Sequence, residues 1–201
     1  MKLFFAPGAC SRASHIALYE SGLKFEAEQL DPKTKKTKSG EDYYKITPKS
    51  QVPALLSDKG ELLTEGSAIM QYIADQAPDK KLMPKAGTWE RYKAQEWLNY
   101  IAAEVHKGFS PLFNKDMPEA AKEIFRANLG KKFDYLSAQL KGHDYLMGNQ
   151  FTVADGYLHT VLNWTKHLNI DLSKWPVLMG YVEKVSSRPG VQAALKAEGA
   201  A

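Results

Sequence analysis

Residues 1–18 have the sequence MKLFFAPGACSRASHIAL, in which a proline-glycine loop joins an apolar run to a helical pattern. Residues 2–6 predict a short β-strand that ends at this loop. Residues 11–21 predict a helix, because apolar side chains recur at helical spacing and Gly22 follows as a stop signal. Cys10, the single cysteine of the chain, lies in the loop directly before the predicted helix.

Cys10 therefore occupies a position with particular chemistry. The first N–H groups of a helix have no partner within the helix, and the helix dipole favours negative charge there. A thiol at this end is biased toward the reactive thiolate, and Ser11 or Ser14 would cap the helix or donate to the sulfur. A lone cysteine is more often a small buried apolar side chain, but the loop position favours the reactive interpretation.

The composition of the chain excludes several classes of protein. With 201 residues, 44% of them hydrophobic and 25% charged, it resembles a globular domain protein with a real core. The net charge of +4 is too small to favour nucleic acid, and no apolar run reaches the ~18 residues of a membrane span. No signal peptide is expected, and a single cysteine precludes an internal disulfide, which favours a reducing cytoplasm. No metal site is expected, since no second cysteine or H-x3-H spacing occurs.

The pattern of predicted elements changes near residue 80. Before that point strands and helices alternate: a strand over 25–30, a hairpin over 53–57 and 61–64, and a helix over 66–77, with a polar loop over 31–42. Residues 77–88 contain two prolines and predict a linker, after which the pattern is helical throughout.

The second half predicts several long helices. An amphipathic stripe begins with Trp89 and Tyr92 and continues through Trp97, Ile101, Val105, Phe109 and Leu112. Further helices are predicted over about 118–140, after Thr152, and over 177–190, where Pro189 is expected to end the helix. Thr152 and Asp155 have the spacing of a capping box, with Asp in place of the usual Glu.

Two further motifs precede predicted elements of the first half. In SQVPAL (50–55), Pro53 is either an ordinary start of an edge strand or a cis proline. The cis form would leave the Val52 N–H and C=O available to an extended peptide. In TEGSAI (64–69), Glu65 either caps its own helix or faces a ligand ammonium, while the Gly66 and Ser67 N–H groups bind a carboxylate.

His106 lies in the helical half, at i+7 from Asn99 and i+3 from Ala103, so the three residues share one face of a continuous α-helix. A lone helical histidine is as often a solvated or core side chain as a functional one. Its ordinary pKa near neutrality suits a proton partner or a cationic neighbour for a thiolate. His15 is expected to be structural.

These segments together resemble a glutathione transferase, specifically the bacterial beta class, which has cysteine at this point. The likeness rests on PGACS, SQVPAL and TEGSAIMQYIAD, and it extends to RYKAQEWLNYIAAEVHKGFSPLF and FTVADGYL in the helical half. The resemblance covers nearly the whole chain. It implies an α/β thioredoxin-like N-terminal domain over 1–78, a linker over 79–88 and an all-α C-terminal domain over 89–201, in a homodimer with a glutathione site between the domains.

The resemblance also implies roles for individual residues. Val52, next to a cis Pro53, would pair with the cysteinyl part of glutathione, Glu65 and Gly66 would hold its γ-glutamyl end, and Lys35 its glycine carboxylate. Cys10 would face the glutathione sulfur with His106 beside it. The catalytic candidates are thus Cys10, His106 and Ser11. The glutathione-binding candidates are Cys10, Lys35, Val52, Pro53, Glu65, Gly66, Ser67, Asn99, Ala103 and His106.

Two departures from the wider superfamily narrow the chemistry. Positions 4 and 5 are both Phe, so the tyrosine hydroxyl that many relatives carry on the first strand is absent, whereas Ser11 leaves a serine route open. Gly66 replaces the serine that often follows the acidic residue, so contact there must come from the backbone or from Ser67.

The sequence therefore predicts a cytoplasmic transferase that joins glutathione to small hydrophobic electrophiles in detoxification, with thiol–disulfide exchange through Cys10. Glutathione would be a co-substrate, and no other cofactor, nucleic acid or membrane is expected. Two alternatives stay open: an enzyme whose main task is glutathione-dependent reduction or peroxide removal, and a non-catalytic protein that binds apolar ligands.

Overall fold

The computed structural model describes residues 1–199 and divides the chain into two compact units. The first unit comprises Met1–Met83 together with the segment from Arg188 onward, and the second comprises Pro84–Ser187. These boundaries differ from the predicted domains, because the end of the chain was expected in the helical domain and instead packs with the first unit. Residues 200 and 201 of that expected domain lie outside the described residues.

The first unit is built on a five-stranded mixed sheet with the strand order β3-β2-β1-β4-β5. Strand β1 pairs parallel with β2 and antiparallel with β4, and β3 and β5 add antiparallel edges. The predicted strands and the hairpin are confirmed, while β3 was missed within the expected loop. The strands are β1 (Lys2–Phe5), β2 (Glu26–Asp31), β3 (Lys36–Thr37), β4 (Ala54–Leu56) and β5 (Leu62–Thr64).

The alternation of side chains along β1 explains how both faces of the sheet are covered. Phe4 packs with Leu30, Tyr43 and Ala54 in a buried cluster, so α2 (Tyr43–Ile46) covers that face. Phe5 points the other way and meets the His15 ring of α1 (Arg12–Ser21) at 5.0 Å. The remaining helices of this unit are α3 (Gly66–Gln76), the 3₁₀ turn η1 (Pro78–Lys80) and α10 (Pro189–Ala197).

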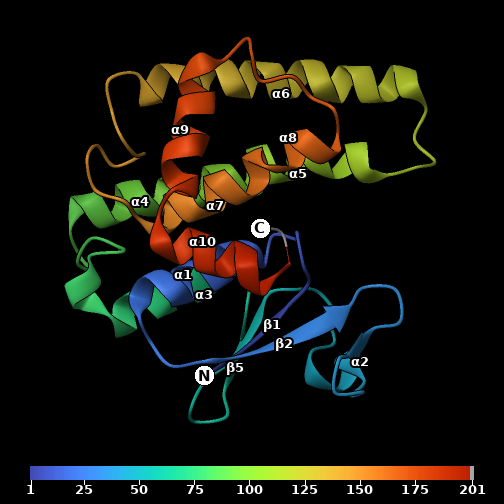
Figure 1. The fold of residues 1–201 in the computed structure, drawn as a ribbon, viewed down its shortest axis with the longest axis vertical. Helices are drawn as coiled ribbons and strands as arrows, with labels where there is room; N and C mark the ends of the chain where they lie inside the picture. The colour runs from blue at the N-terminus through green and yellow to red at the C-terminus, as the bar shows by residue number, and fades with distance from the viewer. Residues whose placement is uncertain (200–201) are drawn as a thin grey trace. The chain divides into compact units, whose positions relative to one another are not determined.

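Helix α1 ends where the sequence predicts but begins at Arg12, one residue after the predicted start, and Ser11 makes no side-chain capping hydrogen bond. Gly22 stops it in the left-handed conformation with φ of 70°, which glycine adopts without steric cost. Helix α10 lies beside α1 (Figure 1). The predicted helix over 177–190 is wrong at its end, because α9 (Pro176–Ser186) stops earlier and Pro189 opens α10. Proline suits this first helical position, where its missing N–H leaves no hydrogen bond unmade.

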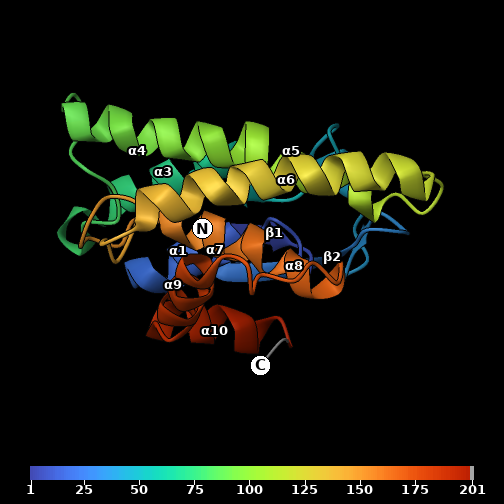
Figure 2. The ribbon, with the colours of Figure 1, turned by 90° about the horizontal axis from the view of Figure 1, so that it is seen from above.

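The second unit is entirely helical apart from turns and isolated bridges. Helix α6 runs alongside α5 (Figure 2). The predicted stripe is correct at Ile101, Val105 and Phe109, which are buried, but wrong at Trp89 and Tyr92, which are 74% and 58% exposed. The elements are α4 (Trp89–Tyr100), the π-helix η2 (Ile101–His106), α5 (Lys107–Phe109), the 3₁₀ helix η3 (Ser110–Phe113), α6 (Glu119–Leu140), α7 (Val153–Leu162), α8 (Trp164–His167) and α9.

The predicted capping box at the start of α7 is confirmed. The Asp155 carboxylate is completely buried and accepts hydrogen bonds from the Thr152 N–H at 2.8 Å and the Thr152 hydroxyl at 3.0 Å. It also accepts the Leu146 N–H at 2.8 Å and the Tyr181 hydroxyl at 2.9 Å. Asp155 therefore joins α7 to α9 and to the loop before it, which is more than the local cap that the sequence predicts.

Candidate functional site

The Cys10 thiol lies at the N-terminal end of α1 and donates to the backbone carbonyl of Val52 at 3.3 Å. The peptide bond between Val52 and Pro53 is cis, so Pro53 is the cis proline and not the ordinary start of an edge strand. The strand β1 and helix α1 place the thiol, and the start of β4 places the carbonyl. Two segments that are 42 residues apart in the chain thus meet at the only sulfur the sequence predicts to be reactive.

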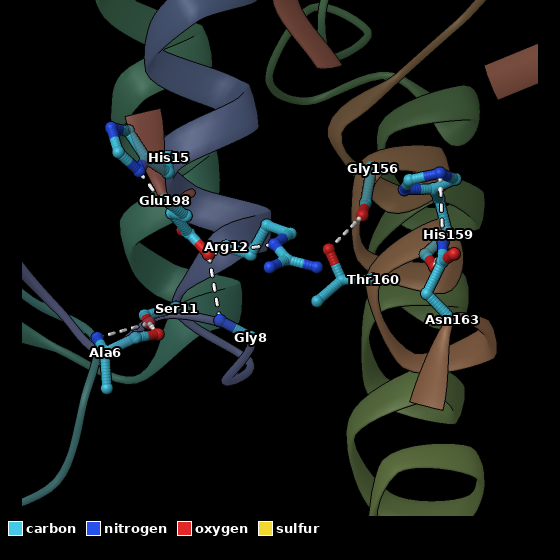
Figure 3. A network of polar contacts seen from close by, with 10 residues as sticks. All are labelled: Ala6, Gly8, Ser11, Arg12, His15, Gly156, His159, Thr160, Asn163 and Glu198. Carbon is cyan, nitrogen blue, oxygen red and sulfur yellow. Dashed lines mark hydrogen bonds and ion pairs between the residues drawn. The ribbon is translucent and has the colours of Figure 1, made fainter. Parts of the chain in front are cut away.

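Ser11, by contrast, is placed for structure rather than chemistry. Its side chain is fully buried, its hydroxyl donates to the Ala6 carbonyl at 3.2 Å, and it accepts the Ala6 N–H at 3.1 Å (Figure 3). A serine hydroxyl has a single proton to donate, and here Ala6 takes it. The structure therefore does not support Ser11 as a catalytic group; it fastens the end of β1 to the start of α1.

Glu198 fixes the same loop from the far end of the chain, which the sequence did not predict. Its buried carboxylate accepts the Gly8 N–H at 3.0 Å and the Arg12 Nε–H at 2.8 Å, and it lies 3.2 Å from His15 Nδ1 (Figure 3). The guanidinium and the backbone donor offset the cost of burying this carboxylate. Removing the carboxylate would leave those donors without an acceptor. His15 is structural, as predicted, and Glu198 positions the loop that carries Cys10.

Glu65 stands before α3 in a strained backbone conformation, with φ of 69° and ψ of 113°. Its side chain makes no capping hydrogen bond to α3, so the simpler interpretation of this residue as a helix cap is wrong. Its carboxylate is exposed and pairs with the Lys49 ammonium at 2.6 Å. Strain at a non-glycine residue is retained only where the surrounding structure requires it, and such residues cluster at ligand sites.

The other predicted residues of the first unit lie around the same segment. The Lys35 ammonium donates to the Ser50 carbonyl at 3.1 Å. Gly66 lies against the Pro53 ring: a side-chain carbon at Gly66 would stand 3.6 Å from Pro53 Cγ, an ordinary contact. Ser67 follows in the first turn of α3, half buried. Contacts therefore link Cys10 to the segment 49–53, and that segment to Lys35, Glu65 and Gly66.

His106 lies in the second unit at the end of η2, where Nδ1 is 2.7 Å from the Tyr157 hydroxyl and the ring meets Trp164 edge-on at 4.9 Å. Burial, followed by the nearby Lys107 charge, lowers the pKa of His106 to about 4. At neutral pH the imidazole is therefore uncharged. The predicted cationic character of His106 is therefore wrong: the imidazole is a neutral donor or acceptor whose ring contacts Tyr157.

The predicted common face of Asn99, Ala103 and His106 also needs correction. The helix is not a continuous α-helix here, since it changes to a π-helix from Ile101 to His106. The wider turn rotates the later residues relative to the earlier ones. Asn99 and Ala103 are exposed and His106 is half buried, so the i, i+4, i+7 argument does not describe this segment.

An aromatic cluster surrounds His106 within the second unit. Trp164 meets Phe109 at 5.7 Å and Phe113 at 5.5 Å, both edge-on. Phe109 is completely buried whereas Phe113 is 48% exposed. An apolar surface of this kind suits hydrophobic ligands.

Residues 1–199 contain neither a cluster suited to a metal ion nor a membrane-spanning helix. No group of three or more His, Cys, Asp or Glu in this range is arranged to hold a metal ion. Within the same range, no helix is both long and apolar enough to cross a membrane.

Both halves of the chain match models of one family. Residues 1–75 match the glutathione S-transferase N-terminal domain, and residues 100–189 match the C-terminal domain. Glutathione S-transferase GstA of Escherichia coli O157:H7 is 50% identical over 199 residues, covering 99% of each chain.

Two solved structures agree with this along the whole chain. A sphingomonad glutathione S-transferase complexed with glutathione has a TM-score of 0.96, 45% identity, and coverage of 100% of both chains. The bacterial beta-class glutathione S-transferase of Sphingomonas chungbukensis has a TM-score of 0.96, 44% identity, and the same coverage.

Proposed function

Because this chain belongs to the glutathione S-transferase family, we propose that it joins glutathione to small hydrophobic electrophiles and holds the tripeptide on its first unit. The resemblance to the bacterial beta class is confirmed by a whole-chain likeness to a structure of that class. The observation that carries the site assignment is the contact between the Cys10 thiol and the Val52 carbonyl, 3.3 Å apart, beside the cis Pro53.

Each part of glutathione then has a complementary group. Val52 offers backbone to the cysteinyl residue, Glu65 offers a carboxylate to the γ-glutamyl ammonium, and Lys35 offers an ammonium to the glycine carboxylate. The N–H groups of Gly66 and Ser67, at the start of an eleven-residue helix, would donate hydrogen bonds to the γ-glutamyl carboxylate. Asn99, Ala103 and His106 remain predictions from the resemblance.

The chemistry proposed for the sulfur atoms has two branches. In conjugation, the glutathione thiolate attacks the electrophile and the leaving group departs with the displaced electron pair. In exchange, the Cys10 thiolate attacks the glutathione sulfur of a mixed disulfide between glutathione and a substrate thiol, forming a Cys10–glutathione disulfide and releasing the substrate thiolate. The chain holds no second cysteine, so another glutathione thiolate must then attack this adduct, regenerating Cys10 and giving oxidised glutathione.

Replacing Glu65 with alanine is expected to weaken glutathione binding by about ten-fold, because the bound ligand would cover a carboxylate that is otherwise 70% exposed and a charge-assisted hydrogen bond is then worth about 1.5 kcal/mol, the lower end of its range. Isothermal titration calorimetry measures this, with Glu61→Ala, an exposed glutamate of the same hairpin region, as the matched control. An unchanged dissociation constant in Glu65→Ala would remove Glu65 from the site.

We also propose a homodimer, supported by aromatic side chains left uncovered in the second unit. Trp89, Tyr92 and Tyr135 are exposed, and Trp97, Tyr100 and Tyr135 line a surface groove of about 340 Å³. Light scattering is expected to give twice the 22.5 kDa chain mass, and Trp89→Glu is expected to shift it toward the monomer. A fully active monomer at nanomolar concentration would contradict the dimer.

We also propose a cytoplasmic location for the protein.

The proposed activity is tested directly by assaying conjugation of an aryl halide against reduction of a glutathione mixed disulfide. Conjugation is expected to proceed with the wild-type chain. Reduction without conjugation would favour the reductase alternative. Retention on immobilised glutathione without turnover of any electrophile would favour the non-catalytic one.

A further inference from the structure

We propose that Lys49 is an internal competitor for glutathione: its ammonium pairs with the Glu65 carboxylate and must leave when the ligand's own ammonium binds there. The inference rests on the proposed function and adds a residue that sets the affinity of that site. Lys49 belongs to none of the motifs that identify the family.

The contact itself supplies the first argument. Lys49 Nζ lies 2.6 Å from Glu65 Oε1 and 3.1 Å from the Thr64 hydroxyl oxygen. A primary ammonium donating to a carboxylate and a hydroxyl reproduces what an α-ammonium of a γ-glutamyl group would do at the same acceptor. A ligand ammonium placed against the same Glu65 Oε1 and Thr64 hydroxyl would overlap the Lys49 ammonium, so binding at this position is an exchange.

The backbone next to Lys49 is held by the hydrogen bonds of a buried neighbour, whereas the Lys49 side chain is 53% exposed and its described contacts are those with Glu65 and Thr64. Ser50 is buried, its N–H donates to the Thr47 carbonyl at 3.0 Å, and its own carbonyl accepts the Lys35 ammonium. Ser50 also has φ of 47°, in the left-handed region that non-glycine residues seldom adopt. Lys49 is therefore presented at a fixed point beside Glu65, from which its long side chain can swing away.

The exposure of the pair sets the size of the effect. The side chains of Lys49 and Glu65 are 53% and 70% exposed, so opening the ion pair returns both charges to water at little cost. Exposed pairs of this kind contribute at most a few-fold to an equilibrium constant. Competition by Lys49 should therefore reduce glutathione affinity modestly and leave the bound complex unchanged.

The electrostatics of the ligand make the predicted direction distinctive. Glutathione at neutral pH carries two carboxylates and one ammonium, so removing any nearby lysine should weaken its binding by lowering the local positive potential. Removing Lys49 is expected to strengthen glutathione binding instead, because Lys49 is the lysine that pairs with Glu65 and its removal leaves that carboxylate available to the ligand ammonium. Lys45 provides the matched control, as an exposed lysine four residues earlier in the same segment.

The test measures glutathione dissociation constants by calorimetry at low ionic strength for the wild-type chain, Lys49→Met, Lys45→Met, Glu65→Gln and the Lys49→Met/Glu65→Gln double variant. Lys49→Met is expected to bind about two- to five-fold more tightly than the wild type, and Lys45→Met slightly less tightly. In the Glu65→Gln background, Lys49→Met should give no tightening. The gain should shrink with added salt, and glutathione acetylated on its amine should show no gain.

Several results would overturn the inference. Weaker binding by Lys49→Met than by Lys45→Met would make Lys49 a contact for the ligand's carboxylates instead of a competitor. Tightening that persists in the Glu65→Gln background would place its origin elsewhere. Failure of the wild-type chain to bind glutathione at all would refute the proposed function itself, which distinguishes that failure from a failure of the Lys49 inference.

Discussion

Replacing Asp155 with alanine is expected to lower the free energy of unfolding by about 3 kcal/mol or more, because each buried donor left without an acceptor costs roughly 1–3 kcal/mol. Three donors would lose the acceptor described for them, namely the N–H groups of Leu146 and Thr152 and the Thr152 hydroxyl, while the Tyr181 hydroxyl would keep its longer contact with the Asp155 backbone carbonyl at 3.4 Å. The loss exceeds that of an ordinary helix cap, which is about 0.5–2 kcal/mol. Urea denaturation followed by circular dichroism measures it.

Asp171→Ala is the matched control, since Asp171 is exposed and bonds only to the nearby Ser173 among the contacts described. Its effect on the unfolding free energy should be small. Glutathione affinity in the folded fraction of Asp155→Ala should be nearly that of the wild type, because the groups proposed to hold the charged ends of glutathione belong to the first unit. An Asp155→Ala chain as stable as the wild type would show that the hydrogen bonds to the Asp155 carboxylate contribute nothing.

The pKa of Asp155 gives the same carboxylate a pH signature. Burial raises its pKa from 3.8 to about 6, despite the donors that oppose the shift. Between about pH 4 and 6 the folded chain therefore binds a proton that the unfolded chain does not, so this group's contribution to stability grows as pH falls through that window. The Asp155→Asn side chain cannot titrate. The free energy of unfolding of the wild type, relative to that of Asp155→Asn, should therefore rise as pH falls from about 6 to 4.

Replacing Cys10 with alanine is expected to abolish the glutathione–protein adduct and most disulfide reduction, while aryl-halide conjugation survives in part. Exchange by this chain needs a thiol of the protein, and Cys10 is the only cysteine in the sequence. Conjugation needs only a glutathione thiolate near an electrophile, which the N-terminal end of α1 still favours without Cys10. His106→Ala is expected to lower conjugation further, through loss of a neutral hydrogen-bonding group.

The measurement combines both assays with the mass of the intact protein after treatment with oxidised glutathione. Cys10→Ser separates two roles of the thiol, because a serine hydroxyl can still donate to the Val52 carbonyl but cannot form a disulfide. It should match Cys10→Ala in exchange and exceed it in conjugation. If Cys10→Ala loses conjugation and reduction equally while still binding glutathione, Cys10 itself activates the substrate and the two-branch chemistry is wrong.

The ends of most strands and helices were predictable because the residues that cause them lie within a few positions of one another. The apolar run and the Pro7-Gly8 loop set β1 and the start of α1, Gly22 ended that helix, and Thr152 with Asp155 began α7. Where local rules competed, prediction failed: Pro189 was taken to end a helix and instead begins α10. Proline forbids a helix interior and suits a first turn equally well, and only the packing of α10 on α1 decides between them.

By itself the sequence determined the order of elements, the family, and the position of the one thiol at a helix start. Only the tertiary structure decided which side chains remain available for chemistry. The Ser11 hydroxyl is hydrogen-bonded to Ala6, and the Glu198 carboxylate accepts the N–H of Gly8, 190 residues earlier in the chain. Burial lowers the pKa of His106, so its ring is uncharged at neutral pH. Spacing along a chain fixes periodicity and caps, but desolvation and contacts between distant segments exist only after the chain has folded, so no pattern in the sequence carries them.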